Sequence, residues 1–260
     1  AALVTWWVLY IRFGREHRVR FEGDYFRELP SERPPAVVGY LYNSGFVGAS
    51  DMVATIMDLA RRGYFKIREE QHKDRSFLEK VGGLPEYDYI IDFVNKDLAD
   101  LRGYERSLVT FLFSSDSARG DSLSLHEFKK EAQKHSHKFH SWFTKWKKKV
   151  VKEAEVAGLL EKKSSTVAIV SSVVGGVAAA IGLLITISTQ VILGIVPIAV
   201  GILVIALSQL IKRRSPDAAE EFVKWRALRK YLLHFSKLDE APPMSLILWE
   251  HFLVYAVTLG

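Results

Sequence analysis

The sequence predicts an α-helical membrane protein with an α+β cytoplasmic domain, in which two winged-helix-like units accompany a transmembrane helical hairpin. Three observations lead to this fold class. No Asp, Glu, Lys, Arg or His occurs between Thr166 and Ile211, and this run is long enough for two spans of roughly 20 apolar residues each. Basic residues flank the run on both sides. The remaining sequence combines amphipathic helix patterns with short strand patterns.

The composition limits the chemistry open to the chain. It has 260 residues and a formal net charge of +6 at pH 7, and its mean hydropathy of +0.05 averages one uncharged block with a densely charged remainder. In a membrane protein, a basic balance first indicates cytoplasmic flanks. Because the chain has no cysteine, disulfides, thiolate nucleophiles and thiolate metal sites are excluded.

Residues 1–11 (AALVTWWVLYI) are apolar but too short to cross a bilayer. Aromatic residues followed by arginine are typical of the cytoplasmic end of a spanning helix. We therefore predict that 1–11 is the end of a truncated transmembrane helix and that 12–35 is a basic linker. The alternative is a buried N-terminal helix of a soluble domain. The predicted membrane-interface residues here are Trp6, Trp7, Tyr10, Arg12 and Arg15.

Residues 36–100 predict the first winged-helix-like unit. Ser50 is a candidate N-cap for an amphipathic helix, and Gly63 is placed to end that helix. The alternating segments 64–68 and 87–94 predict two strands, with a charged, glycine-containing stretch between them. This order of helix, glycine turn, strand, long loop and strand is typical of a winged helix.

Residues 101–165 predict a second unit with an incomplete wing. After an amphipathic helix and a polar loop, Ser124 is followed three residues later by glutamate, as in a capping box. A long helical stripe follows, and we expect a break in it near Ser136. Gly158 in EVAGLLEKK then repeats the position of Gly63 in LARRGYFKI, but the chain continues into the apolar run instead of a wing.

Residues 166–211 predict the transmembrane hairpin, with helices near 167–187 and 191–211 and a turn at Ser188–Gln190. Because the hairpin contains no charged residue, we interpret it as an anchor and not as an ion path. Small residues at helical spacing predict close packing, either within the hairpin or against another copy of the chain. These residues are Gly176, Ala180, Gly182, Gly194 and Gly201.

The distribution of basic residues predicts the orientation in the membrane. The Ser188–Gln190 loop is uncharged, whereas both flanks of the apolar run are basic. The positive-inside rule therefore places 12–165 and 212–260 in the cytoplasm, in a multi-pass protein of the plasma (inner) membrane. The basic flanking residues are Lys162, Lys163, Lys212, Arg213 and Arg214.

Residues 212–260 predict cytoplasmic C-terminal helices. Ser215 and Pro216 have the order of an N-cap and a first helical residue. The apolar end MSLILWEHFLVYAVTLG contains Glu250 and His251 and is too short for a clear span. Two placements stay open for this segment: packing into the cytoplasmic domain, or lying at the membrane surface.

The sequence resembles a bacterial family of predicted membrane proteins, the YciQ-like family (domain of unknown function 2207). The segments that carry the resemblance are PPAVVGYLYN, DMVATIMDLARRGYFKI, YERSLVTFLF, the hairpin and LILWEHFLVYAVTLG. They cover nearly the whole chain in the same order. The resemblance implies that an extracytoplasmic β-rich domain and a spanning helix come before this portion. It implies no activity and no catalytic residues.

No sequence motif indicates catalysis. GxSxG, a glycine-rich phosphate loop and HExxH are all missing from the sequence, so we predict no enzyme activity and no cofactor. Glu131 and His135 lie four residues apart, a spacing that could hold a metal. His135 also falls within the helical stripe, however, and no second helix supplies partner ligands. We therefore predict no metal site.

Basic residues indicate a candidate interaction surface at Arg61, Arg62, Lys147, Lys148 and Lys149. A winged helix is a common reader of DNA. However, the predicted recognition helix also carries Asp51 and Asp58, which repel phosphate. The lysines lie shortly before the apolar run, where anionic lipid would attract them.

We therefore predict a membrane-anchored protein-interaction or signalling scaffold with a cytoplasmic winged-helix-like domain. Its expected partners are membrane lipid and a protein whose identity the sequence does not indicate. One alternative is a membrane-tethered DNA-binding regulator. The other is a transporter subunit, which requires a polar cavity between spans. The expected buried or interface anchors are Trp142, Trp146, Trp225 and Trp249.

Overall fold

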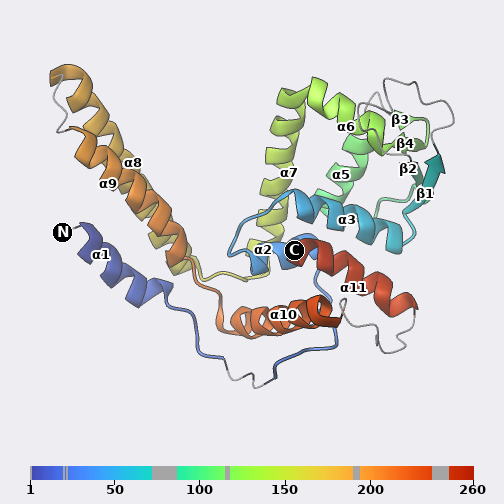
Figure 1. The fold of residues 1–260 in the computed structure, drawn as a ribbon, viewed down its shortest axis with the longest axis horizontal. Helices are drawn as coiled ribbons and strands as arrows, with labels where there is room; N and C mark the ends of the chain where they lie inside the picture. The colour runs from blue at the N-terminus through green and yellow to red at the C-terminus, as the bar shows by residue number, and fades with distance from the viewer. Residues whose placement is uncertain are drawn as a thin grey trace. The chain divides into compact units, whose positions relative to one another are not determined.

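A computed structural model describes residues 2–260 except 20, 22, 72–86, 115–117, 190–193 and 236–245. The chain is mostly helical, with one small antiparallel sheet, so its fold class is α+β (Figure 1). It divides into two compact units. Unit 1 comprises 1–32, 40–46 and 154–238, and unit 2 comprises 33–39, 47–153 and 239–260.

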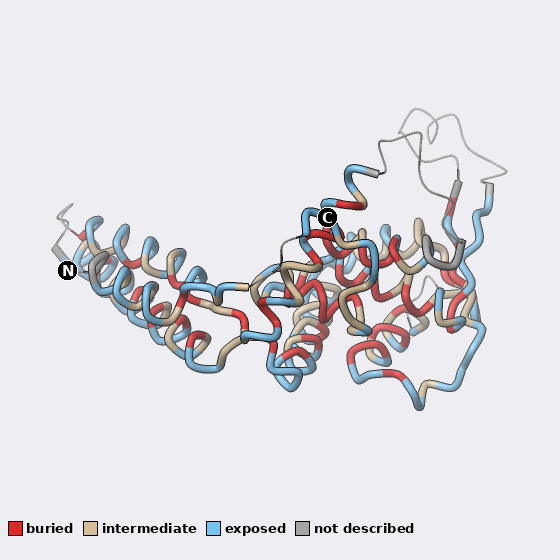
Figure 2. Tube along the Cα trace, turned by 90° about the horizontal axis from the view of Figure 1, so that it is seen from below, coloured by how far each residue is buried: buried red, intermediate tan, exposed pale blue. Residues whose placement is uncertain are grey.

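Unit 1 contains the apolar helices. These are α1 (Ala2–Leu9) with the π-helical turn η1 (Tyr10–Gly14), α8 (Lys162–Thr189), and α9 (Ile195–Ser208) with the 3-10 turn η3 (Gln209–Ile211). Among the described residues, one helix is long and apolar enough to cross a membrane, the segment Lys162–Ser188. The apolar segment Ile195–Ile211 is shorter. Most residues of the α8–α9 pair are exposed or half-buried (Figure 2), as expected for helices that would contact lipid.

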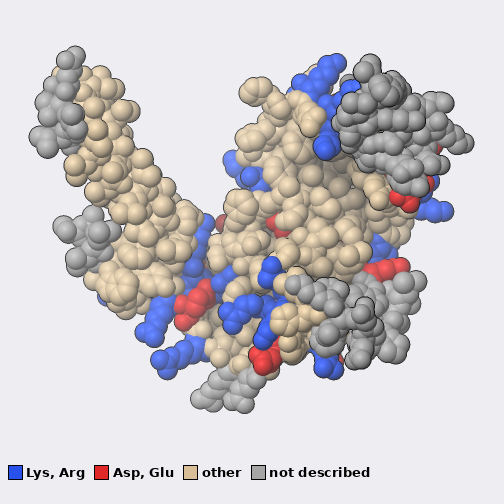
Figure 3. Space-filling model, viewed as in Figure 1, with Lys and Arg blue, Asp and Glu red and all other residues tan. Residues whose placement is uncertain are grey.

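The two predicted spans correspond to these helices. Helix α8 covers the predicted span 167–187, and α9 with η3 covers 195–211 of the predicted span 191–211. The predicted turn at Ser188–Gln190 lies partly outside the described residues, because Ser188 and Thr189 end α8 and Gln190 is not described. Little charge is visible along the pair in Figure 3.

Unit 1 is completed by α10 (Pro216–Phe235), which begins at the predicted Pro216. Its apolar stripe forms a core, with Trp225 and Leu228 both 0% exposed. Trp225 is therefore buried, in agreement with the prediction that it is a buried or interface anchor.

Unit 2 is built around the sheet. Its helices are α2 (Pro35–Tyr42), α3 (Ala49–Arg61), α5 (Gly103–Phe113), α6 (Leu125–Lys134), α7 (Ser136–Val156) and α11 (Leu246–Leu259); the last residues of α2 and of α7 belong to unit 1. Its strands are β1 (Phe65–Gln71), β2 (Tyr87–Phe93), β3 (Ala118–Arg119) and β4 (Ser122–Ser124), in the order β1-β2-β4-β3. Strand β2 pairs antiparallel with both β1 and β4, so residues from both predicted units share one sheet.

Local sequence signals set several of the element ends. Gly63 and Gly158 have φ of +81° and +67°, the left-handed conformation that glycine adopts most easily after a helix. The Ser124 hydroxyl accepts the Glu127 N–H at 3.0 Å and caps α6. The long helical stripe breaks at His135, between α6 and α7.

Three features differ from the sequence prediction or go beyond it. The N-cap of α3 is Gly48 and not Ser50, because the Asp51 carboxylate reaches back to the Gly48 N–H at 2.7 Å. The polar loop before Ser124 contains β3 and β4. The C-terminal segment, left open by the sequence, forms α11 in unit 2, where its residues Phe252 and Leu259 are 0% and 5% exposed.

Candidate functional site

Unit 2 contains a buried carboxyl where α2, α3 and α11 meet. Asp51 is 0% exposed; it accepts hydrogen bonds from the Gly48 N–H and from the Thr258 hydroxyl on α11. Burial raises the pKa of Asp51, although these two hydrogen bonds act in the opposite direction. Gly39 of α2 makes the close approach possible, since a Cβ there would collide with the Asp51 carboxylate and lie 2.9 Å from the Thr258 oxygen.

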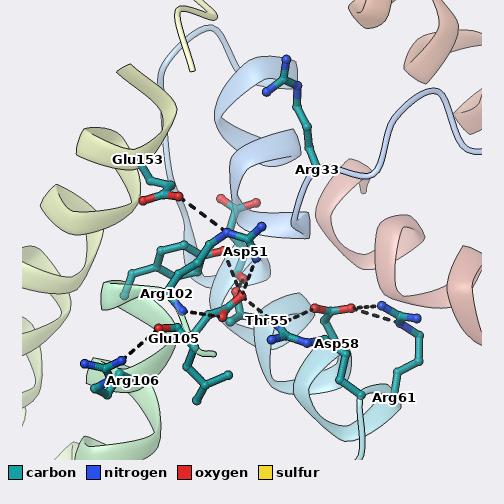
Figure 4. A network of polar contacts seen from close by, with 12 residues as sticks. Arg33, Asp51, Thr55, Asp58, Arg61, Arg102, Glu105, Arg106 and Glu153 are labelled. Carbon is teal, nitrogen blue, oxygen red and sulfur yellow. Dashed lines mark hydrogen bonds and ion pairs between the residues drawn. The ribbon is translucent and has the colours of Figure 1, made fainter. Parts of the chain in front are cut away.

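A second polar network connects the end of α3 to the start of α5 (Figure 4). At its centre is Glu105, which is 1% exposed. Its carboxylate accepts the Arg102 N–H at 2.9 Å, the Arg62 guanidinium at 3.0 Å and the Tyr104 hydroxyl at 3.3 Å. A buried carboxylate needs such partners, because an unpaired buried charge is strongly destabilising.

The two arginines predicted as an interaction surface belong to this network. Arg61 donates to Asp58 at 2.8 Å and to His251 of α11 at 2.7 Å, and Arg62 pairs with Asp58 and Glu105. Burial alone would lower the pKa of Arg62, but the nearby carboxylates outweigh it and raise that pKa. Both guanidinium groups are therefore engaged within the protein, and the network ties α3 to α5 and α11.

Unit 1 contains a comparable cluster around Arg214, at the end of the apolar helices. Arg214 is 5% exposed; its guanidinium donates to the carbonyl oxygens of Leu41 at 2.9 Å and Tyr42 at 2.8 Å and pairs with Glu16 at 2.7 Å. It also lies 3.6 Å from the ring centre of Phe222. Burial lowers the pKa of Arg214, and Glu16 partly offsets this. The side chain satisfies carbonyls that the end of α2 leaves unpaired.

This placement changes the role predicted for Arg214. The sequence prediction puts it among the basic residues at the membrane interface, whereas the structure buries its charge against the end of α2. Its neighbour Arg213 is also occupied, because it pairs with Glu161. Glu161 in turn lies 2.6 Å from His17. Burial would raise the pKa of Glu161, but the hydrogen bonds from Arg213 and His17 lower it.

The packing of α8 against α9 uses some of the predicted small residues and not others. A Cβ on Gly182 would lie 2.7 Å from the Gly194 carbonyl oxygen, and one on Gly201 would collide with the Gly175 carbonyl. Gly176 has nothing within 4 Å and Ala180 is exposed. The close face therefore runs through Gly175 and Gly182, and Gly176 and Ala180 lie off it. Of the predicted small residues, Gly182, Gly194 and Gly201 lie on this close face.

The other residues predicted to lie at the membrane interface are in or beside α1, η1, the start of α8 and η3. Trp6 donates its indole N–H to the Leu207 carbonyl at 3.0 Å and stacks on Tyr10, which ties α1 to α9. Trp7 is 55% exposed. Arg12, Arg15, Lys162 and Lys163 are exposed, and Lys212 is half-buried.

The aromatic residues of α7 divide into a buried and a partly exposed group. Trp146 is 0% exposed and donates to the Tyr104 carbonyl at 3.2 Å. Trp142 is half-buried and stacks on Phe111 of α5, with 3.8 Å between ring centres. Lys148 and Lys149 are exposed and Lys147 is half-buried. The side chain of Trp249 lies outside the described residues.

Sequence reasoning missed the roles of Asp51, Glu105 and Gly175. From the sequence, Asp51 counts only as an acidic residue that opposes DNA binding, and no buried network is predicted around Glu105. A glutamate three residues after Arg102 is a capping-box signal, and this signal could have placed Glu105 at a helix start. No local signal points from Asp51 to Thr258, 207 positions away.

A protein-family model matches most of the chain. A family model described as predicted membrane protein (DUF2207), C-terminal domain, matches residues 22–260. No curated protein and no solved structure matches the chain.

Proposed function

Because the chain belongs to the family of predicted membrane proteins described as DUF2207, C-terminal domain, we propose that it is a multi-pass protein of the plasma membrane. Helices α8 and α9 are its transmembrane hairpin. Residues 12–165 and 212–260 lie in the cytoplasm. The family match supports membrane location, and the spans and their orientation are our proposal.

The observation that carries this topology is the backbone pairing at the base of the hairpin. The Glu161 N–H donates to the Arg213 carbonyl at 2.9 Å, and the Ser215 N–H donates to the Leu159 carbonyl at 3.1 Å. Segments joined by hydrogen bonds must leave the bilayer on the same side. The basic residues beside these segments favour the cytoplasmic side. The apolar segment Ile195–Ile211 is just long enough to span a bilayer.

We propose that the cytoplasmic part is winged-helix-like and acts as a protein-interaction or signalling scaffold without enzymatic activity. The order of α3, the Gly63 corner and the antiparallel strands β1 and β2 supports the winged-helix interpretation. On this strand pair, Ile67 and Tyr89 are 42% and 50% exposed. Their pairing register makes them diagonal neighbours on one face of the sheet, so together they offer exposed apolar surface of the kind that a protein partner can cover.

The alternative of a DNA-binding regulator has weaker support. DNA reading by α3 would need Arg61 and Arg62, and both are paired with carboxylates in the protein. Helix α11 also packs on α3 through the Thr258–Asp51 and His251–Arg61 contacts. Binding would therefore require these contacts to break.

Site-specific photo-crosslinking in native membranes tests the scaffold. A photoreactive amino acid replaces Ile67 or Tyr89 in the full-length protein, and a matched control places it at Arg226, exposed on α10. We expect the same protein adduct from positions 67 and 89 and none from position 226, as identified by mass spectrometry. Adducts to nucleic acid, or identical adducts from all three positions, would contradict the proposal.

A further inference from the structure

Helix α7 presents a basic face that neither the sheet nor the polar networks use. No Asp or Glu occurs between Glu131 and Glu153. Exposed residues recur at spacings of three and four along α7 and therefore share one face. We call this the α7 basic face; it consists of Lys138, Ser141, Lys145, Lys148 and Lys152, all exposed.

Within the residues that the structure describes, the lysine charges on this face are not paired with carboxylates. In the described part of the chain, none of them forms an ion pair with Asp or Glu, whereas Lys96 and Lys230 do. Figure 3 shows lysine and arginine side chains at the outer edge of α7 and over the corner between α6 and α7. An uncompensated single-sign surface of this kind attracts a polyanion.

An aromatic ring lies at the edge of the basic face. Trp142 lines two open hollows. One, of about 410 Å³, is bordered by Lys138 and Lys145, and the other, of about 520 Å³, is bordered by Arg106 and Lys149. Tryptophan beside lysine is typical of protein surfaces at the depth of lipid headgroups. The ring is held in place by its stacking on Phe111.

Chain connectivity favours the membrane as the polyanion that this face binds. Helix α7 ends at Val156 and α8 begins at Lys162, and the chain between them spans at most roughly 20 Å. The last turn of α7 therefore stays close to the point where the proposed hairpin enters the bilayer. Anionic headgroups attract lysines within a Debye length of the surface.

From these observations we propose that the α7 basic face docks on the anionic headgroups of the membrane surface, with Trp142 at headgroup depth. This inference rests on the membrane anchorage proposed above, but not on the scaffold role. It adds a peripheral lipid contact to the transmembrane anchor, and the contact limits how far unit 2 can move from the bilayer.

A fluorescent label tests the docking directly. Since the chain has no cysteine, Ser141→Cys gives a single labelling position on the face. The labelled full chain is placed in nanodiscs of phosphatidylcholine alone or with about one third phosphatidylglycerol, each containing a lipid with a spin label on its headgroup. We expect several-fold stronger quenching in the anionic discs, and a loss of that difference as potassium chloride is raised.

Two matched variants separate the face from overall charge. The face variant is Lys138→Gln, Lys145→Gln, Lys148→Gln and Lys152→Gln, and the control variant with the same change in charge is Lys66→Gln, Lys96→Gln, Arg226→Gln and Lys230→Gln. We expect the face variant to lose the anionic-lipid quenching and the control variant to keep it. Circular dichroism checks that both variants fold.

Other outcomes overturn the inference. Equal quenching in neutral and anionic discs, or quenching unchanged in the face variant, would exclude headgroup docking. A label that responds to duplex DNA or polyglutamate in neutral discs, but not to anionic lipid, would assign the face to another partner. A chain that does not remain in the discs would contradict the anchorage instead, so the two failures are distinguishable.

Discussion

Burial and hydrogen bonding act on Asp51 in opposite directions, and burial dominates, so its pKa is raised. A carboxyl with a raised pKa in the folded protein stabilises the fold below its unfolded pKa of about 3.9. This contribution is lost as pH rises through the folded pKa, because the buried carboxyl must then ionise. The free energy of unfolding of unit 2 therefore includes a contribution from Asp51 that decreases as pH rises.

The variant Asp51→Asn removes this pH-dependent contribution to stability. An amide can accept from the Gly48 N–H and donate to the Thr258 oxygen without ionising. We expect the melting temperature of the variant, minus that of the native protein, to become more positive from pH 4 to pH 8. A second variant, Thr258→Val, removes a hydrogen bond that favours the ionised form, so its melting temperature is expected to fall more steeply with pH. A difference for Asp51→Asn that stays constant over this range would refute the account.

Glu105 is the residue on which the second network depends. Glu105→Ala removes the buried carboxylate that accepts from Arg62, and losing a hydrogen bond to a charged group costs about 1.5–3 kcal/mol of unfolding free energy. The matched control is Glu70→Ala, because the Glu70 side chain is 57% exposed and pairs with Arg68; such a surface pair contributes at most about 1 kcal/mol. Denaturant unfolding in detergent measures both. Equal losses would show that burial does not set the strength of the network.

The pairing of α8 with α9 depends on adjacent glycines in opposite environments. A Cβ on Gly175 would lie 2.7 Å from the Gly201 carbonyl oxygen, whereas one on Gly176 would meet nothing within 4 Å. Overpacking a close contact typically costs about 1–3 kcal/mol. We therefore expect Gly175→Val to separate the helices and Gly176→Val to be tolerated.

Disulfide trapping measures this difference between the helices. The hydroxyl groups of Ser172 and Ser208 are 2.5 Å apart, so cysteines at these positions should crosslink in the otherwise cysteine-free chain. Crosslinking is expected to survive in Gly176→Val and to drop strongly in Gly175→Val. The same yield from both variants would exclude the glycine face as the packing surface.

For the whole molecule, the proposed orientation can be tested with single cysteines. Ser188→Cys lies at the end of α8 away from the basic flanks, and Lys163→Cys and Lys212→Cys lie within those flanks. A membrane-impermeant maleimide added to intact cells is expected to label only the first. The other two should react after permeabilisation. Labelling of position 163 or 212 from outside would reverse the topology.

Features that depend on neighbouring residues could be predicted from the sequence. The uncharged apolar run predicted the part of α8 within 167–187, and Gly63 and Gly158 predicted the ends of α3 and α7, because apolar composition and capping are local properties. The family resemblance, confirmed by the match over 22–260, also came from the order of such local segments.

Contacts between distant residues depend on tertiary packing and could not be predicted from the sequence. Asp51 accepts a hydrogen bond from Thr258 on a helix at the other end of the chain, and Arg214 donates to a carbonyl at the end of α2. The choice of Gly175 over Gly176 depends on the direction from which α9 approaches. Helical periodicity states which side chains share a face, but not what covers that face. Packing between distant segments supplies this information, and no local pattern in the sequence contains it.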